Sequence, residues 1–397
     1  MKVVIVNKFL SNTGGADRHC VGLGRTLARR GHEVAYLAAR DDLRAGGGNV
    51  SGRHVSYVDP TVTHASRDAL ELSGRIRAAT HAFWNGTAAS AMERLIKSFR
   101  PDVVHLHKLH PQLSPAPGIV AARKGLPVVQ TLHDFDLMAA SPTDSRGGWW
   151  DSDETRISYR LLNAAALPYR RHALMRRVSE FVSISRFVAR VYESHGIGST
   201  VIPSFVDIEN ADEDPLSFDD RSGVLFLGRL RPEKGVADVI HLARALPEVE
   251  VTIAGSGVLW PTVHRAAQTL DNLTAPGFVD DEQVLRDMVR QARLVVIPSR
   301  CQEGANLVCL EAMARGTPVV AYANGGLAEN VVDSGGGRIV PVDPESLVHV
   351  VRDAYDDRDR WLEMSERGYQ SFQQRHAPDV YATQLEKIYD RAAGVRR

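Results

Sequence analysis

Two carboxylates frame a short turn in the last third of the chain. Glu303 and Glu311 lie on either side of the segment Gly304-Ala305-Asn306-Leu307, which leads into an apolar run typical of a helix start. The backbone N–H groups of such a turn can bind an anion, and carboxylates accept hydrogen bonds from sugar hydroxyls. The sequence therefore predicts a site for a ligand that carries both phosphate and hydroxyl groups.

A second candidate element is the segment from Gly228 to Gly235, which follows an apolar run directly. It contains Arg229 and Lys234, and a guanidinium together with an ammonium can neutralise a diphosphate without a metal ion. The alternative is a solvated surface loop. The Gly255-Ser256-Gly257 turn follows the next apolar run in the same way, so we expect it to lie at the same sheet edge and to add to the same pocket.

Gly14 and Gly15 come soon after the first apolar run, just before residues with helical spacing. Two glycines there allow the backbone to approach a ligand closely, although a simple tight turn explains them equally well. The Gly-x-Gly-x-x-Gly spacing of dinucleotide-binding proteins is absent from this position.

Four histidines, His105, His107, His110 and His133, lie in or just after expected strands. His105 and His107 would share one strand face, which is compatible with metal binding, but no carboxylate or cysteine has supporting ligand spacing. We therefore expect no metal site. His133 follows an apolar run and is expected to face a ligand, with a satisfied core histidine as the alternative.

Several further motifs lie in the first half of the chain. Asp134-Phe135-Asp136 and Asp151-Ser152-Asp153 match a pattern that can hold a divalent ion, but we interpret them as solvated or acceptor-side loop residues. The pair Trp149-Trp150 is suited to stacking on a sugar or an apolar acceptor. The basic segment from Arg170 to Arg177 suits an anionic acceptor or a lipid head group, but a solvated helix face is the favoured interpretation.

The elements that must position these residues form two series of short apolar runs, separated by helix-like or loop sequence. Such alternation predicts two doubly wound α/β domains of Rossmann-like type that face each other across a cleft, with ligands at the carboxyl ends of the strands. We expect an N-terminal domain at 1–203, a linker at 204–222, a C-terminal domain at 223–377 and a last amphipathic helix within 378–397. The first series of runs is 3–6, 34–38, 103–106, 128–132, 181–184 and 201–202; the second is 224–227, 249–254, 294–297, 319–320 and 337–340.

Composition narrows the classes of function. The 397 residues carry 48 basic and 48 acidic side chains, so nothing in the overall charge indicates a nucleic-acid partner. Three cysteines without paired spacing indicate reduced thiols. The N-terminus lacks a signal-peptide pattern and no stretch is apolar enough to span a bilayer. We expect a cytoplasmic protein, with peripheral membrane contact left open.

These motifs together resemble the family 4 retaining glycosyltransferases of the GT-B fold, over nearly the whole chain. The resemblance rests on Gly14-Gly15, His133, Gly228-Arg229 with Lys234, the Glu303 to Glu311 spacing and Gly325-Gly326-Leu327-Ala328-Glu329. The family pattern also implies that the last helix crosses back onto the first domain.

The resemblance implies roles for individual residues. Arg229, Lys234 and the turn after Glu303 would bind the donor diphosphate, Glu311 the ribose hydroxyls, and Glu303 and His133 the transferred sugar. Gly15 would give the phosphate and the acceptor room to approach. The implied reaction is a front-face substitution that retains configuration and requires neither a metal nor another cofactor. The donor would be a UDP-sugar such as UDP-GlcNAc or UDP-Glc, or a GDP-sugar. The acceptor would be a small molecule, a saccharide or a lipid-linked hydroxyl.

Two departures and two alternatives accompany this resemblance. Ser204-Phe205-Val206-Asp207 replaces the family's usual Asn-Gly-Val-Asp after the interdomain proline, and Asn306 stands where Gly or Pro is common. The alternatives are a GT-B-fold sugar-nucleotide epimerase, and a degenerate member that binds sugar nucleotides without turning them over.

Overall fold

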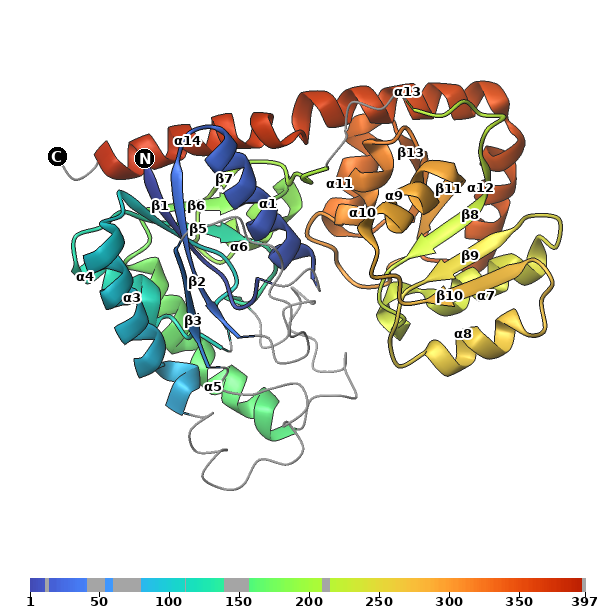
Figure 1. Ribbon diagram of the computed structural model, residues 1–397. Helices are drawn as coiled ribbons and strands as arrows, with labels where there is room; N and C mark the ends of the chain where they lie inside the picture. The colour runs from blue at the N-terminus through green and yellow to red at the C-terminus, as the bar shows by residue number, and fades with distance from the viewer. Residues whose placement is uncertain are drawn as a thin grey trace. The chain divides into compact units, whose positions relative to one another are not determined.

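The computed structural model describes residues 1–10, 14–40, 54–59, 80–110, 112–138, 157–208 and 215–394. Its contacts divide the chain into two compact units (Figure 1). The first unit comprises Met1–Asp207 together with Pro378–Arg397, and the second comprises Ile208–Ala377.

The first unit is built on a seven-stranded parallel sheet with the strand order β3-β2-β1-β4-β5-β6-β7. Parallel strands need crossover connections, which helices supply here. The strands are β1 (Lys2–Val6), β2 (Glu33–Ala39), β3 (His54–Val58), β4 (Val103–Leu106), β5 (Val128–Leu132), β6 (Glu180–Ser183) and β7 (Thr200–Val201); the helices are α1 (Gly15–Arg29), α3 (Gly86–Phe99), α4 (Ala116–Arg123), α5 (Ile157–Met175), α6 (Arg186–Glu193) and α14 (Pro378–Gly394).

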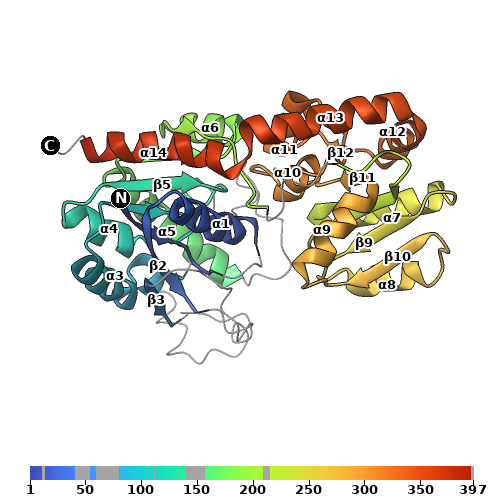
Figure 2. The same cartoon turned by 45° about the horizontal axis from the view of Figure 1, so that its top comes forward.

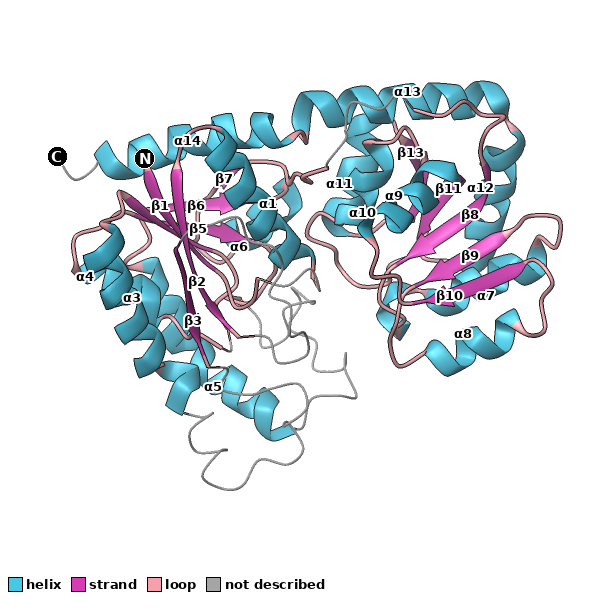
Figure 3. Cartoon of the chain, in the orientation of Figure 1, coloured by secondary structure: helices cyan, strands magenta, loops and turns pink. Residues whose placement is uncertain are grey.

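The second unit contains a six-stranded parallel sheet with the order β10-β9-β8-β11-β12-β13 (Figure 3). Its strands are β8 (Ser222–Leu227), β9 (Val251–Ala254), β10 (Leu273–Gly277), β11 (Ala292–Ile297), β12 (Val319–Tyr322) and β13 (Gly337–Val340). Its helices are the 3-10 turn η1 (Pro232–Lys234), α7 (Val236–Ala245), α8 (Trp260–Ala267), α9 (Glu282–Gln291), α10 (Leu307–Met313), α11 (Gly325–Ser334), α12 (Pro344–Asp356) and α13 (Arg358–Arg375).

Both sheets confirm the predicted doubly wound α/β class. In each, the strand order reverses beside the first strand of the unit, β1 or β8, and ligands of such sheets bind beyond the carboxyl ends of the strands at that switch point. Of the strands in the described residues, β3 and β10 are the two that the apolar runs did not predict. The expected cleft between the domains stays a prediction.

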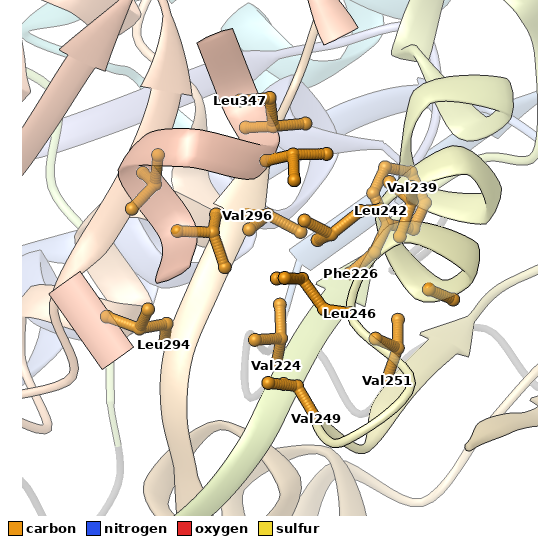
Figure 4. Packing of buried hydrophobic residues seen from close by; sticks show 14 of the residues in the cluster. Val224, Phe226, Val239, Leu242, Leu246, Val249, Val251, Leu294, Val296 and Leu347 are labelled. Carbon is orange, nitrogen blue, oxygen red and sulfur yellow. The ribbon is translucent and has the colours of Figure 1, made fainter. Parts of the chain in front are cut away.

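Each sheet owes its stability to apolar side chains that the strands and the flanking helices bury together. In the second unit, Val224 and Phe226 of β8 pack with Val296 of β11, Leu242 of α7 and Leu347 of α12 (Figure 4). All five have exposed fractions of 3% or less. Central strands buried on both faces read as continuous apolar runs, which is why the sequence reveals them.

Side-chain caps fix where several of the helices begin. Asn85, Ser185, Asp281, Asp343 and Asp357 each accept a backbone N–H from the first turn of the helix that follows. Such caps satisfy donors that the helix itself leaves unpaired.

The last helix, α14, lies alongside α1 in the first unit (Figure 2). Its apolar face, with Tyr381, Leu385, Ile388 and Tyr389, is buried, as the predicted amphipathic spacing requires. On the polar side, Arg30 donates to both carboxylate oxygens of Glu386 at 2.8 Å. Among the described residues, no helix is both long enough and apolar enough to cross a bilayer.

Candidate functional site

A partly buried ion pair joins two of the predicted site residues of the second unit. Lys234 Nζ donates to Glu303 Oε1 at 2.6 Å, and Ser299 Oγ donates to the same oxygen at 2.7 Å. The side chains of Lys234 and Glu303 have exposed fractions of 18% and 13%. The ammonium has three protons, so this pair leaves donors on Lys234 for a further anion.

The charges of this pair stabilise each other. Burial, the largest single influence, lowers the pKa of Lys234, but the charge of Glu303, the neighbouring Cys301 and the hydrogen bond to Glu303 together raise it above its usual value. Burial raises the pKa of Glu303, but the charge of Lys234 and hydrogen bonds from Lys234, Ser299 and Asn306 bring it below its usual value. Both groups are therefore charged near neutral pH.

The turn that carries Lys234 is held against the loop that carries Glu303. The backbone N–H groups of Arg300 and Cys301 both donate to the carbonyl of Glu233, at 2.8 and 3.3 Å. Gly235 then ends the 3-10 turn with a φ of 70°, and a Cβ built on it would lie 1.9 Å from the carbonyl oxygen of Pro298. Glycine is required here both by the backbone conformation and by the close approach of a second backbone segment.

Gly235→Ala is expected to destabilise the second unit by about 3 kcal/mol or more, because the left-handed backbone and the clash with Pro298 act together. Chemical denaturation measures the change. The matched control is Gly198→Ala, where a Cβ meets nothing within 4 Å. Equal unfolding midpoints for the two variants would contradict the close approach.

Arg229 lies two residues beyond the end of β8 and is exposed. The positive charge of Arg229 lowers the pKa of Lys234, although burial, Glu303 and Cys301 have larger effects. Arg229 makes no ion pair with any described residue. Both cations lie in the second unit, and their convergence on a diphosphate stays a prediction.

The glycine turns after β8 and β9 lie against each other. Gly228 N donates to Ala254 O at 3.0 Å, and Leu230 N donates to Ser256 O at 2.8 Å. A Cβ on Gly255 would lie 1.8 Å from the Gly228 carbonyl oxygen, and one on Gly257 would lie 2.4 Å from that of Leu230. The structure thus places both turns at one sheet edge, as expected.

The turn after Glu303 has the conformation that explains its unusual residue. Asn306 has a φ of 62°, which favours glycine but is also tolerated by asparagine. Its Oδ1 accepts from Cys309 N at 3.1 Å and caps α10, which carries the buried Glu311. Gly304, Ala305 and Leu307 complete the turn, and Gly326 N donates to Glu303 O at 2.7 Å. The Gly325 to Glu329 segment therefore meets the Glu303 turn.

A supporting network was not predicted from sequence. Asp238, at the start of α7, accepts from Arg300 Nε and Nη2 at 2.9 and 2.8 Å, and from Tyr322 OH at 3.0 Å. These contacts tie α7 to β12 and to the loop that carries Glu303. Ser299 was also missed. The Asp238 network and Ser299 were missed for the same reason. The sequence does not indicate which distant carboxylate a hydroxyl or a surface charge contacts in the fold.

Gly14, Gly15 and His133 lie in the first unit. Gly14 is the N-cap of α1, and Gly15 is its exposed first residue. His133 directly follows β5 and is partly exposed; its Nε2 lies 2.9 Å from His107 Nδ1. His107 follows the end of β4. The centroid of its ring lies 4.1 Å from that of His105, so the two rings are neighbours.

The structure describes two of the charged motifs. The Asp134 carboxylate pairs with Lys108 and its carbonyl accepts from Tyr192 OH, so Asp134 is only partly solvated, and its acceptor-side role stays a prediction. In the basic segment His172 and Arg176 are exposed, as a solvated face requires, whereas Arg170 is buried and donates to the carbonyl of Asp136. Burial, together with Asp134, raises the pKa of Asp136 to about 6. The Trp149-Trp150 and Asp151-Ser152-Asp153 motifs lie outside the described residues.

Two histidines of the first unit, the buried His105 and the partly exposed His133, predict a loss of stability in mild acid. Burial, followed by neighbouring positive charge, lowers the pKa of His105 and of His133 to about 3. Between pH 6.5 and 3 the unfolded chain binds protons that the folded chain does not, so stability decreases as pH falls below 6.5. At pH 5 each such histidine costs about 2 kcal/mol.

Urea unfolding at pH 7 and pH 5, with EDTA present, measures this loss. His105→Gln should reduce the pH dependence, whereas His241→Gln, at a partly exposed histidine of the second unit, should leave it unchanged. A pH dependence that is the same in all three proteins would contradict the assignment.

Comparison with known proteins adds independent information. The model for Glycosyltransferase Family 4 matches residues 13–210, and that for Glycosyl transferases group 1 matches residues 207–371. Glycogen synthase of Mycobacterium tuberculosis is 30% identical over 87% of this chain and 83% of that protein. Phosphatidyl-myo-inositol mannosyltransferase of Mycolicibacterium smegmatis is 27% identical over 96% of this chain and 91% of that protein.

Solved structures share the fold. Sucrose-phosphate synthase from Thermosynechococcus elongatus superposes with a TM-score of 0.72 at 18% identity, covering 100% of both chains. Anabaena HepE in complex with UDP-glucose superposes with a TM-score of 0.68 at 17% identity, covering 98% of this chain and 99% of that one. The two doubly wound sheets are those of the GT-B architecture.

Proposed function

This chain belongs to glycosyltransferase family 4, and from that premise we propose that it transfers a sugar from a nucleoside-diphosphate donor to a hydroxyl acceptor with retention of configuration. The donor is a UDP-sugar such as UDP-GlcNAc or UDP-Glc. The observation that carries the proposal is the partly buried Lys234–Glu303 pair, together with the exposed Arg229 just beyond the end of β8 in the same unit.

The proposed chemistry assigns the diphosphate to the two cations. Arg229 and the remaining protons of Lys234 bind the phosphate oxygens, and they stabilise the negative charge that grows there as the bond to the sugar breaks. The turns at Gly228, Gly255 and Gly257 carry no side chain and give the donor room at the sheet edge. No metal ion is needed to neutralise the leaving group.

Glu303 suits hydroxyl binding better than nucleophilic attack. Its Oε1 already accepts from Lys234 and Ser299, which lowers the basicity that a nucleophile needs. We therefore propose the front-face substitution that the family resemblance implies. In it, the departing diphosphate takes the proton of the acceptor hydroxyl. Glu311 binds the ribose hydroxyls, and His133 contacts the transferred sugar.

The bound nucleotide differs among solved structures that share the fold. HepE was solved with UDP-glucose, whereas the catalytic domain of starch synthase IV from Arabidopsis thaliana was solved with ADP and acarbose. Both structures are under 20% identical to this chain. The base of the nucleotide is therefore the first quantity to measure.

The test begins with a thermal-shift screen of UDP- and GDP-sugars in EDTA, because a ligand that binds the folded state raises the unfolding temperature. The best donor is then incubated with a panel of saccharide and lipid-linked acceptors. We expect nucleotide release and, by NMR, a product with the anomeric configuration of the donor.

Three results would contradict the proposal. An inverted product would refute retention, and isomerised donor formed without acceptor would indicate an epimerase. Tight donor binding with neither hydrolysis nor transfer would indicate a non-catalytic binder.

A further inference from the structure

Three histidines that are distant in sequence meet in the first unit. His19 lies in α1, His107 just after β4 and His133 just after β5. The ring centroid of His133 lies 4.8 Å from that of His19 and 5.2 Å from that of His107. One nitrogen from each of the three side chains lies within 4.8 Å of the other two.

Two of these histidines have nitrogens without a partner. His19 Nε2 and His107 Nε2 are buried and accept or donate no hydrogen bond among the described residues. Both residues have an exposed fraction of 2%. Buried polar atoms are almost always paired, so two such nitrogens in one cluster point to a ligand.

The opposite ring nitrogens are the ones already in use. His107 Nδ1 lies 2.9 Å from His133 Nε2, and His19 Nδ1 lies 3.3 Å from Ser204 Oγ. When each Nδ1 donates, each Nε2 carries the lone pair of a neutral imidazole. This is the tautomer that metal-binding histidines adopt when a second group holds their other nitrogen.

Aromatic and hydrogen-bonding side chains surround the cluster. His105 stacks on His107 at 4.1 Å, and its own nitrogens lie 2.7 Å from Tyr389 OH and 2.8 Å from Thr131 Oγ1. The rings of Phe205 and Tyr381 pack on His19 at 4.6 and 5.1 Å. His105 is therefore fully used, and it supports the cluster without belonging to it.

We propose that His19, His107 and His133 bind one divalent late first-row transition ion, such as Zn²⁺, with water in the fourth position. Three neutral imidazoles supply three lone pairs, and this ligand set suits zinc and its neighbours. Partly exposed His133 gives the ion and its water a side open to solvent.

Binding requires modest movement. Zinc holds nitrogen at about 2.0–2.1 Å, so tetrahedral ligands lie roughly 3.4 Å apart, and the three nitrogens must draw together. His133 gives up its hydrogen bond with His107 and binds the ion instead. The nearest cation, Lys108, is already paired with Asp134, which offsets its repulsion of the ion.

The proposed ion site lies in the first unit and contains none of the residues assigned to the diphosphate, but it shares His133 with the proposed sugar contact. An ion there would use the lone pair of His133, the residue assigned above to the sugar. Ion binding is therefore measured directly, and transfer activity is not the readout.

The experiment strips the full-length protein with EDTA, exchanges the buffer and titrates ZnCl₂ by calorimetry. We expect one ion per chain, and we expect His19→Gln and His107→Gln each to weaken binding by about 100-fold or more. The control is His195→Gln, an exposed histidine of the same unit, which should bind as the parent does. Substitution with Co²⁺ should give a visible absorption band that the first two variants lose.

Circular dichroism establishes that each variant is folded. If His107→Gln does not fold, the partly exposed His133→Gln replaces it and should show the same loss. The proposal is overturned if the parent binds no Zn²⁺ or if folded His19→Gln still binds one ion with unchanged affinity. It is also overturned if the control variant His195→Gln loses Zn²⁺ binding.

Discussion

Lys234→Met will lower kcat/KM for sugar transfer by about 10³-fold and will also destabilise the protein. The loss of activity follows from removing a charge that stabilises the departing diphosphate. The loss of stability follows from leaving the partly buried Glu303 without its cation, which costs about 3 kcal/mol. Steady-state kinetics with the identified donor and urea unfolding measure the two effects separately.

A double variant separates these effects. In Lys234→Met/Glu303→Gln a neutral amide replaces the carboxylate, so most of the lost stability should return. Transfer should stay at or below the level of the single variant. Lys387→Met, at an exposed lysine of α14, is the control and should match the parent in both measurements. Recovery of activity in the double variant would contradict a role for the Lys234 charge in catalysis.

Arg229→Met will lower kcat/KM by about 10²- to 10³-fold without changing stability. The guanidinium is exposed and pairs with no described residue, so the folded protein loses little when it is removed. The same guanidinium is assigned to the diphosphate, where a lost charged donor raises the barrier by several kcal/mol. Arg229→Lys should restore only part of the rate, because an ammonium does not bind phosphate in a bidentate way.

The control for Arg229 is Arg352→Met, an exposed arginine of α12. It should leave both kinetics and the unfolding midpoint unchanged. Equal kcat/KM values in the Arg229 and Arg352 variants would remove Arg229 from the diphosphate site.

The fold was predictable where burial is complete. Strands such as β1 and β11 are buried almost throughout and read as continuous apolar runs. The edge strand β10 alternates in burial and contains Pro276, so its sequence looks like a turn. Edge strand β3 was missed likewise, because His54 and Ser56 interrupt its apolar residues.

Each half of the site was predicted from residues that are close in sequence. The Gly228 to Gly235 segment carries Lys234 and the Glu303 to Glu311 segment carries Glu303, and the fold joins the two through one ion pair. Asn306, which departs from the family pattern, keeps the left-handed φ that such a turn requires.

Contacts over long separations had no sequence signal. Ser299 on Glu303 was missed because serine is common and its partner is chosen by the fold. His19 was missed because α1 brings it to His107 and His133 only in the folded unit. The spacing of His105 and His107 instead suggested a metal-binding pair on one strand face. His105 does not belong to the cluster, since both of its ring nitrogens already have hydrogen-bond partners in Tyr389 and Thr131.

A crystal structure with the best UDP-sugar bound in the presence of EDTA tests the central claim most directly. We expect the diphosphate oxygens within about 3 Å of the Arg229 guanidinium and of Lys234 Nζ, with Glu303 on a hydroxyl of the sugar. A diphosphate bound elsewhere, with Arg229 and Lys234 directed away from it, would contradict the claim.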